Sequence, residues 1–197
     1  MRGFGILILL AGCATPAAEP VEPGVIAGTV ALKGAPTGDV FVFIREGLEG
    51  RRFEVPAEPV VLDQAGFRFS PRVFGIRAGQ TLRITSQDTS QHNVHAQPFR
   101  NPPFNQNMFD GDVIEKRFEA AETMILFQCH FHPEMKAYAG VLDHPFFAVT
   151  GPEGTFALKG VPPGRYVVEA WQEDRGSKRL PVTLPPDRGA RLEFVFD

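Results

Sequence analysis

The sequence predicts an all-β protein. Its 197 residues include 20 Gly and 18 Pro, residues that favour turns, and short runs rich in Val and Phe lie between them. No stretch shows an amphipathic helical repeat long enough to compete with this reading. The length allows one large or two small domains. Lys and Arg are scattered and the net charge is −3, so no nucleic-acid partner is expected.

Three blocks of expected strands follow one another along the chain. In residues 24–45, two apolar runs on either side of a Gly/Pro turn predict two strands. In residues 60–143, apolar or alternating runs predict strands at 60–62, 66–69, 72–76, 80–86, 113–118, 124–129 and 139–142. In residues 146–197, the same patterns predict strands at 146–150, 155–158, 166–171 and 191–196.

The first and last blocks look like two halves of one module. Residues 28–36 read Gly-x-Val-x-x-Lys-Gly-x-Pro, and residues 147–171 contain Val-Pro-Pro-Gly-Arg-Tyr within an apolar alternation. Together they resemble the carboxypeptidase-regulatory-like (transthyretin-like) β-sandwich. Each half alone would leave unpaired strand edges and half a core. We therefore expect one discontinuous sandwich, residues 24–59 plus 144–197, with residues 60–143 inserted as a second domain.

The N-terminus looks like a targeting segment. Arg2 precedes an apolar run that ends in Ala11-Gly12-Cys13, and this run is too short to span a bilayer. It resembles a bacterial lipoprotein signal, which implies a signal peptide over residues 1–12 and lipidation of Cys13. Residues 13–23 would then be a Pro-rich tether. Because Ala rather than Asp follows Cys13, the resemblance implies the outer membrane, facing the periplasm. The alternative is an ordinary secretory signal with a chance Cys.

The chain contains two cysteines. If Cys13 is lipidated, Cys129 is the remaining thiol in an oxidising compartment and has no partner for an intramolecular disulfide. A lone thiol in such a compartment needs a reason to persist, and metal ligation supplies one.

Cys129 opens the most informative motif of the chain. It follows the apolar run 124–128 and begins a Cys-x-x-His-x-x-Met sequence with His132 and Met135, while His92 upstream can add a second imidazole. Alternation along 124–129 should place Cys129 on the apolar face of its strand. Two His, one Cys and a weak axial Met form the ligand set of a blue-copper site. The alternatives are a buried Cys with surface histidines and, less in keeping with a Met ligand, a zinc site.

The sequence around this motif resembles the cupredoxins, and the amicyanin group in particular. The resemblance is carried by residues 69–95, which include His-Asn-Val-His, and by residues 126–141, which include Cys-x-x-His-Pro-x-Met. It implies a Greek-key β-sandwich that binds one type 1 copper ion through His92, Cys129, His132 and Met135. It also implies that Asn93 braces the Cys loop by hydrogen bonds. Together with the split sandwich, the chain resembles bacterial lipoproteins of the methylamine-utilisation type.

Neighbouring residues have less defined roles. His95 matches a position that is not a ligand in the family, and His130 should point away from the copper because it follows Cys129 on a strand. His130 could also act as a relay or a weak ligand of a second metal. Residues 96–109 are expected near the copper end as an apolar surface for a redox partner, or alternatively as part of the core between the domains.

These expectations together predict a carrier rather than an enzyme. The protein would pass single electrons as copper cycles between Cu(II) and Cu(I), with transient partners such as a c-type cytochrome or a dehydrogenase, at a membrane to which Cys13 anchors it. The alternative function is to bind, buffer or deliver copper in the cell envelope. A third reading is a structural module that has lost its metal.

Overall fold

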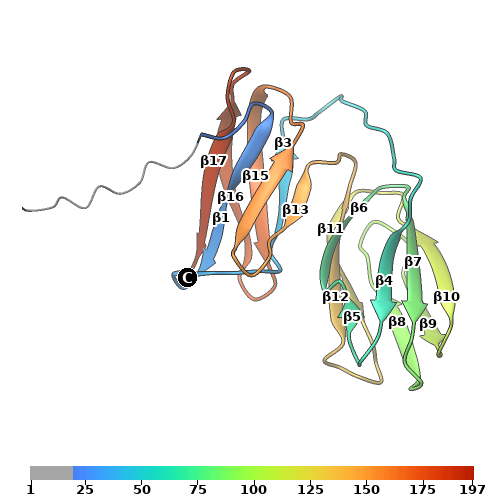
Figure 1. Ribbon diagram of the computed structural model, residues 1–197. Helices are drawn as coiled ribbons and strands as arrows, with labels where there is room; N and C mark the ends of the chain where they lie inside the picture. The colour runs from blue at the N-terminus through green and yellow to red at the C-terminus, as the bar shows by residue number, and fades with distance from the viewer. Residues whose placement is uncertain (1–19) are drawn as a thin grey trace, which may run out of the picture.

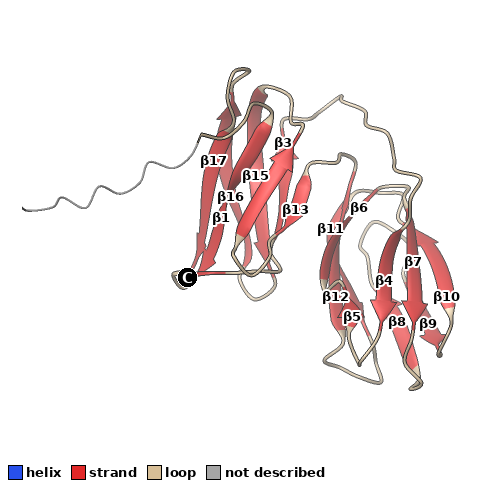
Figure 2. Ribbon diagram, viewed as in Figure 1, coloured by secondary structure: helices blue, strands red, loops and turns tan. Residues whose placement is uncertain are grey.

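The computed structural model describes residues 20–197, so Cys13, the expected signal peptide and most of the expected tether lie outside the described residues. This part of the chain forms seventeen strands and no helix (Figure 2), which confirms the all-β prediction. Residues 20–197 thus contain no helix long and apolar enough to cross a membrane.

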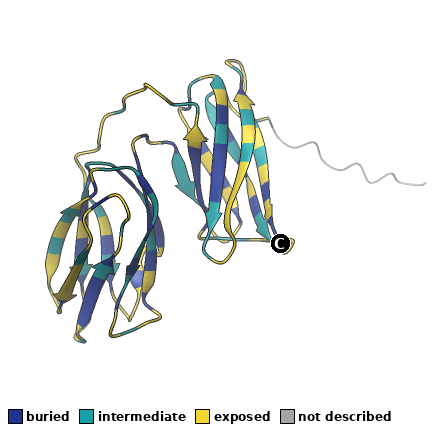
Figure 3. Ribbon diagram, turned by 180° about the vertical axis from the view of Figure 1, so that it is seen from behind, coloured by how far each residue is buried: buried dark blue, intermediate teal, exposed yellow. Residues whose placement is uncertain are grey.

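Strands from the two ends of the described chain build one sandwich. Their bounds are β1 Val25–Leu32, β2 Ala35–Pro36, β3 Phe41–Glu46, β13 Phe147–Val149, β14 Thr155–Lys159, β15 Gly164–Gln172, β16 Gly176–Leu184 and β17 Ala190–Phe196. One sheet has the order β14-β1-β17, with β2 paired to β1, and the other has the order β13-β3-β15-β16. Strand β1 is antiparallel to β14 and parallel to β17, so apart from the short β2 its partners lie far away in sequence. Buried and exposed positions alternate along β14 and β17 (Figure 3), as expected for strands with one face on a core.

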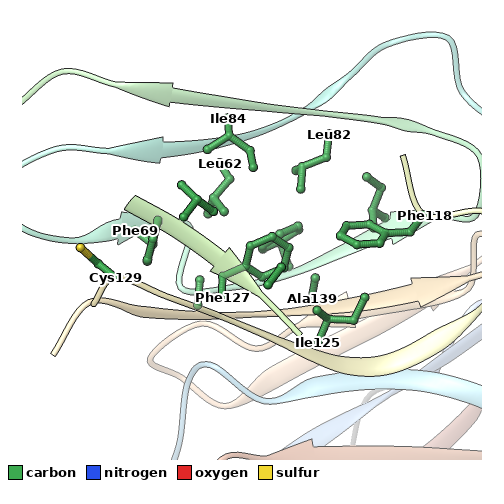
Figure 4. Close-up of a cluster of buried hydrophobic side chains, with 14 of the residues drawn as sticks. Leu62, Phe69, Leu82, Ile84, Phe118, Ile125, Phe127, Cys129 and Ala139 are labelled. Carbon is green, nitrogen blue, oxygen red and sulfur yellow. The ribbon is translucent and has the colours of Figure 1, made fainter. Parts of the chain in front are cut away.

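The middle of the chain builds a second sandwich (Figure 1). Its strands are β4 Val60–Gln64, β5 Phe69–Ser70, β6 Val73–Arg77, β7 Thr81–Ser86, β8 His92–Ala96, β9 Phe104–Met108, β10 Val113–Arg117, β11 Glu122–Gln128 and β12 Lys136–Leu142. One sheet has the order β10-β7-β4-β5 and the other the order β6-β12-β11-β8-β9. Figure 4 shows the apolar side chains that fill the space between these sheets, with Cys129 at one end of the cluster.

The two sandwiches pack against each other through a small apolar cluster. It contains Phe41, Phe43, Val73 and Leu142, all buried. The second sandwich has no side chains at the centre of this contact, because Gly75 and Gly140 lie opposite each other on β6 and β12. A Cβ atom on Gly140 would lie 2.2 Å from the Phe41 ring, and one on Gly75 would lie 2.2 Å from the Phe147 ring. Glycine is therefore required at both positions for this close packing.

A polar group borders the same junction. Glu173, in the turn between β15 and β16, accepts a hydrogen bond from the Tyr138 hydroxyl at 2.5 Å and pairs with the guanidinium of Arg72. Partial burial tends to raise the pKa of Glu173, but the hydrogen bonds from Tyr138 and Arg72 outweigh it and lower the pKa below its ordinary value. Burial and the neighbouring carboxylate raise the pKa of Tyr138, so its hydroxyl stays protonated and donates.

Strands β2, β8, β9 and β16 were not among the predicted ranges. Strand β9 covers Phe104–Met108, in the segment expected to form an apolar partner surface, and it pairs with β8 at the edge of its sheet. Strand β16 covers Gly176–Leu184 at the edge of the other sandwich, where most of its residues are exposed. Strands β9 and β16 are edge strands with few buried positions. β9 carries no hydrophobic alternation, and β16 alternates only in its second half, at Leu180, Val182 and Leu184.

Candidate metal centre

Strand β11 brings Cys129 to one end of the second sandwich. Ile125, Phe127 and Cys129 are 1%, 0% and 2% exposed, whereas the residues between them are partly exposed. This confirms the predicted alternation, which continues one residue past the end of the strand. Figure 4 shows the Cys129 sulfur at the outer edge of the core, where the apolar wall ends.

Three ligand-type atoms meet at this point. His92 Nδ1 and His132 Nδ1 lie 3.0 Å apart, and Cys129 Sγ lies 3.9 Å from the first and 3.7 Å from the second. The point equidistant from all three atoms lies about 2.1 Å from each, which matches metal–ligand bonds of about 2.0–2.3 Å to imidazole and thiolate. Among the described residues, this trio forms a group of His, Cys, Asp or Glu side chains that can hold a metal ion.

Met135 is held beside the trio by a short turn. The backbone N–H of Met135 donates to the carbonyl of His132 at 2.9 Å, with Pro133 in the second position of the turn, where its fixed φ is favourable. The backbone N–H of Cys129 in turn donates to the Met135 carbonyl at 3.1 Å. Met135 is 1% exposed and belongs to the same core cluster as Cys129. The loop between β11 and β12 therefore returns the thioether residue to the end of the sandwich where the three ligand atoms meet.

Asp88 positions His92, and the sequence analysis did not identify it. Its Oδ2 lies 2.9 Å from Nε2 of His92, whose side chain is fully buried. Partial desolvation tends to raise the pKa of Asp88, but hydrogen bonds from the backbone N–H groups of Phe67 and Gly66 and from His92 lower it below its ordinary value. An ionised Asp88 accepts a hydrogen bond from Nε2–H, which leaves Nδ1 unprotonated and turned toward Cys129.

Asn93 links the strand of His92 to the loop of Cys129. Its side-chain Oδ1 accepts a hydrogen bond from the backbone N–H of His130 at 2.6 Å, and its Nδ2 donates to Asn105 Oδ1 at 2.6 Å. Its own backbone N–H donates to Cys129 Sγ at 3.5 Å. The side chain is thus placed as the sequence resemblance implied, and the contact from the backbone N–H holds the sulfur in position.

The Phe67 ring packs against the partly exposed His132. The Phe67 ring lies edge-on to His132, with 4.8 Å between the ring centroids, and Phe67 and Phe131 are 44% and 50% exposed. The expectation for residues 96–109 is met only at the end of the segment, where Met108 on β9 lies opposite His92 and Phe109 is exposed. It is wrong for the rest. Strand β8 runs from His92 away from the metal centre, so Phe99 lies beside Glu122 at the opposite end of the sandwich. Phe104 packs on the core of the second sandwich rather than between the domains.

His95 and His130 form a pair outside the buried trio. His95 Nδ1 lies 2.7 Å from His130 Nε2, with Gln128 Nε2 3.4 Å from both nitrogens. Partial burial and the neighbouring His130 lower the pKa of His95 below its ordinary value. His130 is exposed and lies on the outer face of the strand, as its position next to Cys129 predicted.

Comparisons with known proteins give structural neighbours and no relatives by sequence. No family model matches the chain, and no curated protein matches it. A reduced amicyanin mutant matches with a TM-score of 0.39 and 21% identity, over 45% of this chain and 86% of that chain. A copper-containing nitrite reductase from Thermus scotoductus SA-01 matches with a TM-score of 0.40 and 19% identity, over 59% of this chain and 28% of that chain. The assignment of a metal centre therefore rests on the ligand atoms themselves.

Proposed function

We propose that the protein is a cupredoxin that carries single electrons through one type 1 copper ion. The triangle formed by His92 Nδ1, Cys129 Sγ and His132 Nδ1 carries this proposal, because its edges of 3.0–3.9 Å fit one shared ion. Two imidazoles and a thiolate, with a buried Met nearby, suit copper in both of its common oxidation states. Zinc could also bind to the two imidazoles and the thiolate, but its usual protein ligands are Cys, His, Asp and Glu rather than a thioether.

Copper bound here would supply a reversible one-electron couple, Cu(II)/Cu(I). The chain's own residues keep the site rigid: Asp88 fixes His92, Asn93 fixes the Cys129 loop, and the turn at Pro133 fixes Met135. His92, Cys129 and Met135 are at most 2% exposed, so these side chains are shielded from water. A site that does not rearrange between oxidation states favours fast electron exchange.

Electrons would enter and leave at His132. His132 is the partly exposed member of the trio, and the exposed rings of Phe67 and Phe131 beside it form an apolar rim. A rim of this kind suits a small, transient contact with a redox protein such as a c-type cytochrome or a dehydrogenase. We propose a carrier rather than an enzyme, because the remaining ligands are enclosed in protein.

Copper handling is the second candidate function. The soft Cys and Met donors also suit Cu(I) that is passed to an acceptor. Because His132 is partly exposed, copper could enter and leave the site beside it. Two measurements distinguish the functions on copper-loaded protein: cyclic voltammetry, and the rate of Cu(I) loss to a Cu(I) chelator. A reversible wave with Cu(I) loss over hours supports electron transfer. Complete Cu(I) transfer within seconds would support delivery instead.

We further propose attachment to the outer membrane, facing the periplasm, through lipid on Cys13. Support comes from the sequence of residues 1–13. Cys13→Ser should release the protein from the membrane fraction, with Cys129→Ser as the control that stays attached. Mass spectrometry that found an unmodified N-terminus at another residue would contradict this proposal.

A further inference from the structure

We propose that His95 and His130 form a second copper site, for Cu²⁺, on the outer face of the sheet that carries Cys129 on its inner face. His95 lies on β8 and His130 follows β11, and these strands pair so that His95 is opposite Gln128. The pairing brings the two imidazoles together from positions 35 residues apart. This site uses none of the atoms of the Cys129 centre and does not depend on it.

The distance between the two nitrogens fits adjacent positions around one ion. His95 Nδ1 and His130 Nε2 lie 2.7 Å apart. Two nitrogens at a right angle around an ion, each at a bond length of about 2.0 Å, lie about 2.8 Å apart. The two nitrogens of the buried trio, His92 Nδ1 and His132 Nδ1, have a similar separation of 3.0 Å.

Gln128 offers a third donor. Its amide nitrogen lies 3.4 Å from both His95 Nδ1 and His130 Nε2, and so faces the gap between them symmetrically. A half-turn of a side-chain amide exchanges its nitrogen and oxygen, which brings a carbonyl oxygen to the same place. Gln97 lies against the His95 ring, with its amide nitrogen 3.0 Å from His95 Nε2 and 3.2 Å from His95 Nδ1. After the same half-turn, its oxygen would accept a hydrogen bond from Nε2–H and leave Nδ1 unprotonated for metal binding.

The donor set and its exposure favour Cu²⁺. Imidazole nitrogen binds copper, nickel and zinc, and Cu²⁺ is first in affinity among the divalent ions of this series. His130 is exposed and His95 is partly exposed, so water can complete the coordination. Since the site holds no thiolate, Cu²⁺ bound there would lack the intense thiolate absorption expected of Cys129.

The test is a Cu²⁺ titration of the protein without a histidine tag, followed by calorimetry, visible absorption and electron paramagnetic resonance. Wild-type protein should bind two equivalents, one of them without the thiolate band. His95→Ala and His130→Ala should each bind one equivalent and keep the band, and Gln128→Leu should weaken the second equivalent. Gln106→Ala, an exposed amide on β9, should still bind two.

Cys129→Ser separates this proposal from the function proposed above. That variant should lose the thiolate band and retain the equivalent that depends on His95. A wild-type protein that binds a single equivalent, with the thiolate band, would overturn the second site, as would His95→Ala and His130→Ala variants that both still bind two. A single equivalent without the band that is lost in His95→Ala would instead contradict the Cys129 centre. Loss of the band with both equivalents intact in the histidine variants would equally contradict the assignment.

Discussion

Asp88 Oδ2 lies 2.9 Å from His92 Nε2, so a carboxylate holds the buried imidazole by the nitrogen that does not face Cys129. This contact fixes the ring orientation and places the proton on Nε2. His92 Nδ1, 3.9 Å from Cys129 Sγ, is then available as a ligand without any rearrangement.

Removal of this carboxylate should weaken metal binding. Asp88→Ala leaves the Nε2–H of His92 without its acceptor and should lower copper affinity by roughly 10- to 100-fold, the usual effect of losing such a partner. Asp88→Asn keeps an acceptor oxygen, so its copper affinity should fall by less than that of Asp88→Ala. Competition with a chelator measures both affinities, and Asp110→Ala, at an exposed position, serves as the control. Equal affinities in Asp88→Ala and wild type would show that the contact does not orient the ligand.

Replacement of Met135 should change the reduction potential of the copper and leave the thiolate-to-copper absorption band in place. Leu has nearly the volume of Met, so Met135→Leu should fold normally in this buried position. It removes a weak axial donor that favours Cu(II), and the reduction potential should therefore rise. A redox titration measures the change, with Met124→Leu, a partly buried Met at the domain junction, as the matched control. An unchanged potential would remove Met135 from the ligand set.

The contact between Gly140 and Phe41 should not tolerate a methyl group. A Cβ on Gly140 would lie 2.2 Å from the Phe41 ring, which is fully buried and cannot move away freely. Gly140→Ala should therefore lower the free energy of unfolding by about 1–3 kcal/mol. Gly151→Ala is the control, because a Cβ there meets no atom within 4 Å. Urea denaturation compares the two, and equal stabilities would mean that the sandwiches separate at little cost.

The contribution of Glu173 should depend on pH. Its pKa is lowered in the folded state, so its carboxylate stabilises the fold above the unfolded-state value of about 4.3, and this contribution is lost as the pH falls through the folded-state pKa. Glu173→Gln should therefore lower stability at pH 7, by less than about 1 kcal/mol because Arg72 is partly exposed. The difference from wild type should shrink in urea denaturation near pH 3. Glu115→Gln is the control, because Glu115 forms an exposed ion pair with Arg83. A difference in stability between Glu173→Gln and wild type that stays constant with pH would exclude the ionised carboxylate as the cause.

Three of the four candidate ligands could be picked out from the sequence because their motif is local, whereas His92 lies 37 residues before Cys129. Cys129, His132 and Met135 lie within seven residues of each other, and the alternation of β11 fixes which face the thiol occupies. Asp88 could not be identified in the same way. It precedes His92 by four residues in an irregular loop, and the backbone N–H groups that hold its carboxylate come from Gly66 and Phe67 in the loop between β4 and β5, a contact that depends on how the sheet folds.

The sequence contained part of the information needed to pair His95 with His130, but not the register of their strands. Both residues follow an inward-facing residue by an odd number of positions, His92 for one and Cys129 for the other, so both point to the outer face of the sheet. The sequence does not show that β8 and β11 are neighbours with His95 opposite Gln128. Strand β9 was missed because its central residues, Asn105, Gln106 and Asn107, are exposed and polar.

The most direct test of the copper centre is the visible absorption spectrum of Cu(II)-loaded protein, compared with that of Cys129→Ser. With Cys129, His92 and His132 around one Cu(II) ion, wild type should show an intense thiolate-to-copper band toward the red end of the visible range. Cys129→Ser should abolish the band, because a hydroxyl cannot act as the charge-transfer donor, whereas His130→Ala should preserve it. Protein that binds copper stoichiometrically yet stays colourless when oxidised, or a band that survives Cys129→Ser, would contradict the assignment.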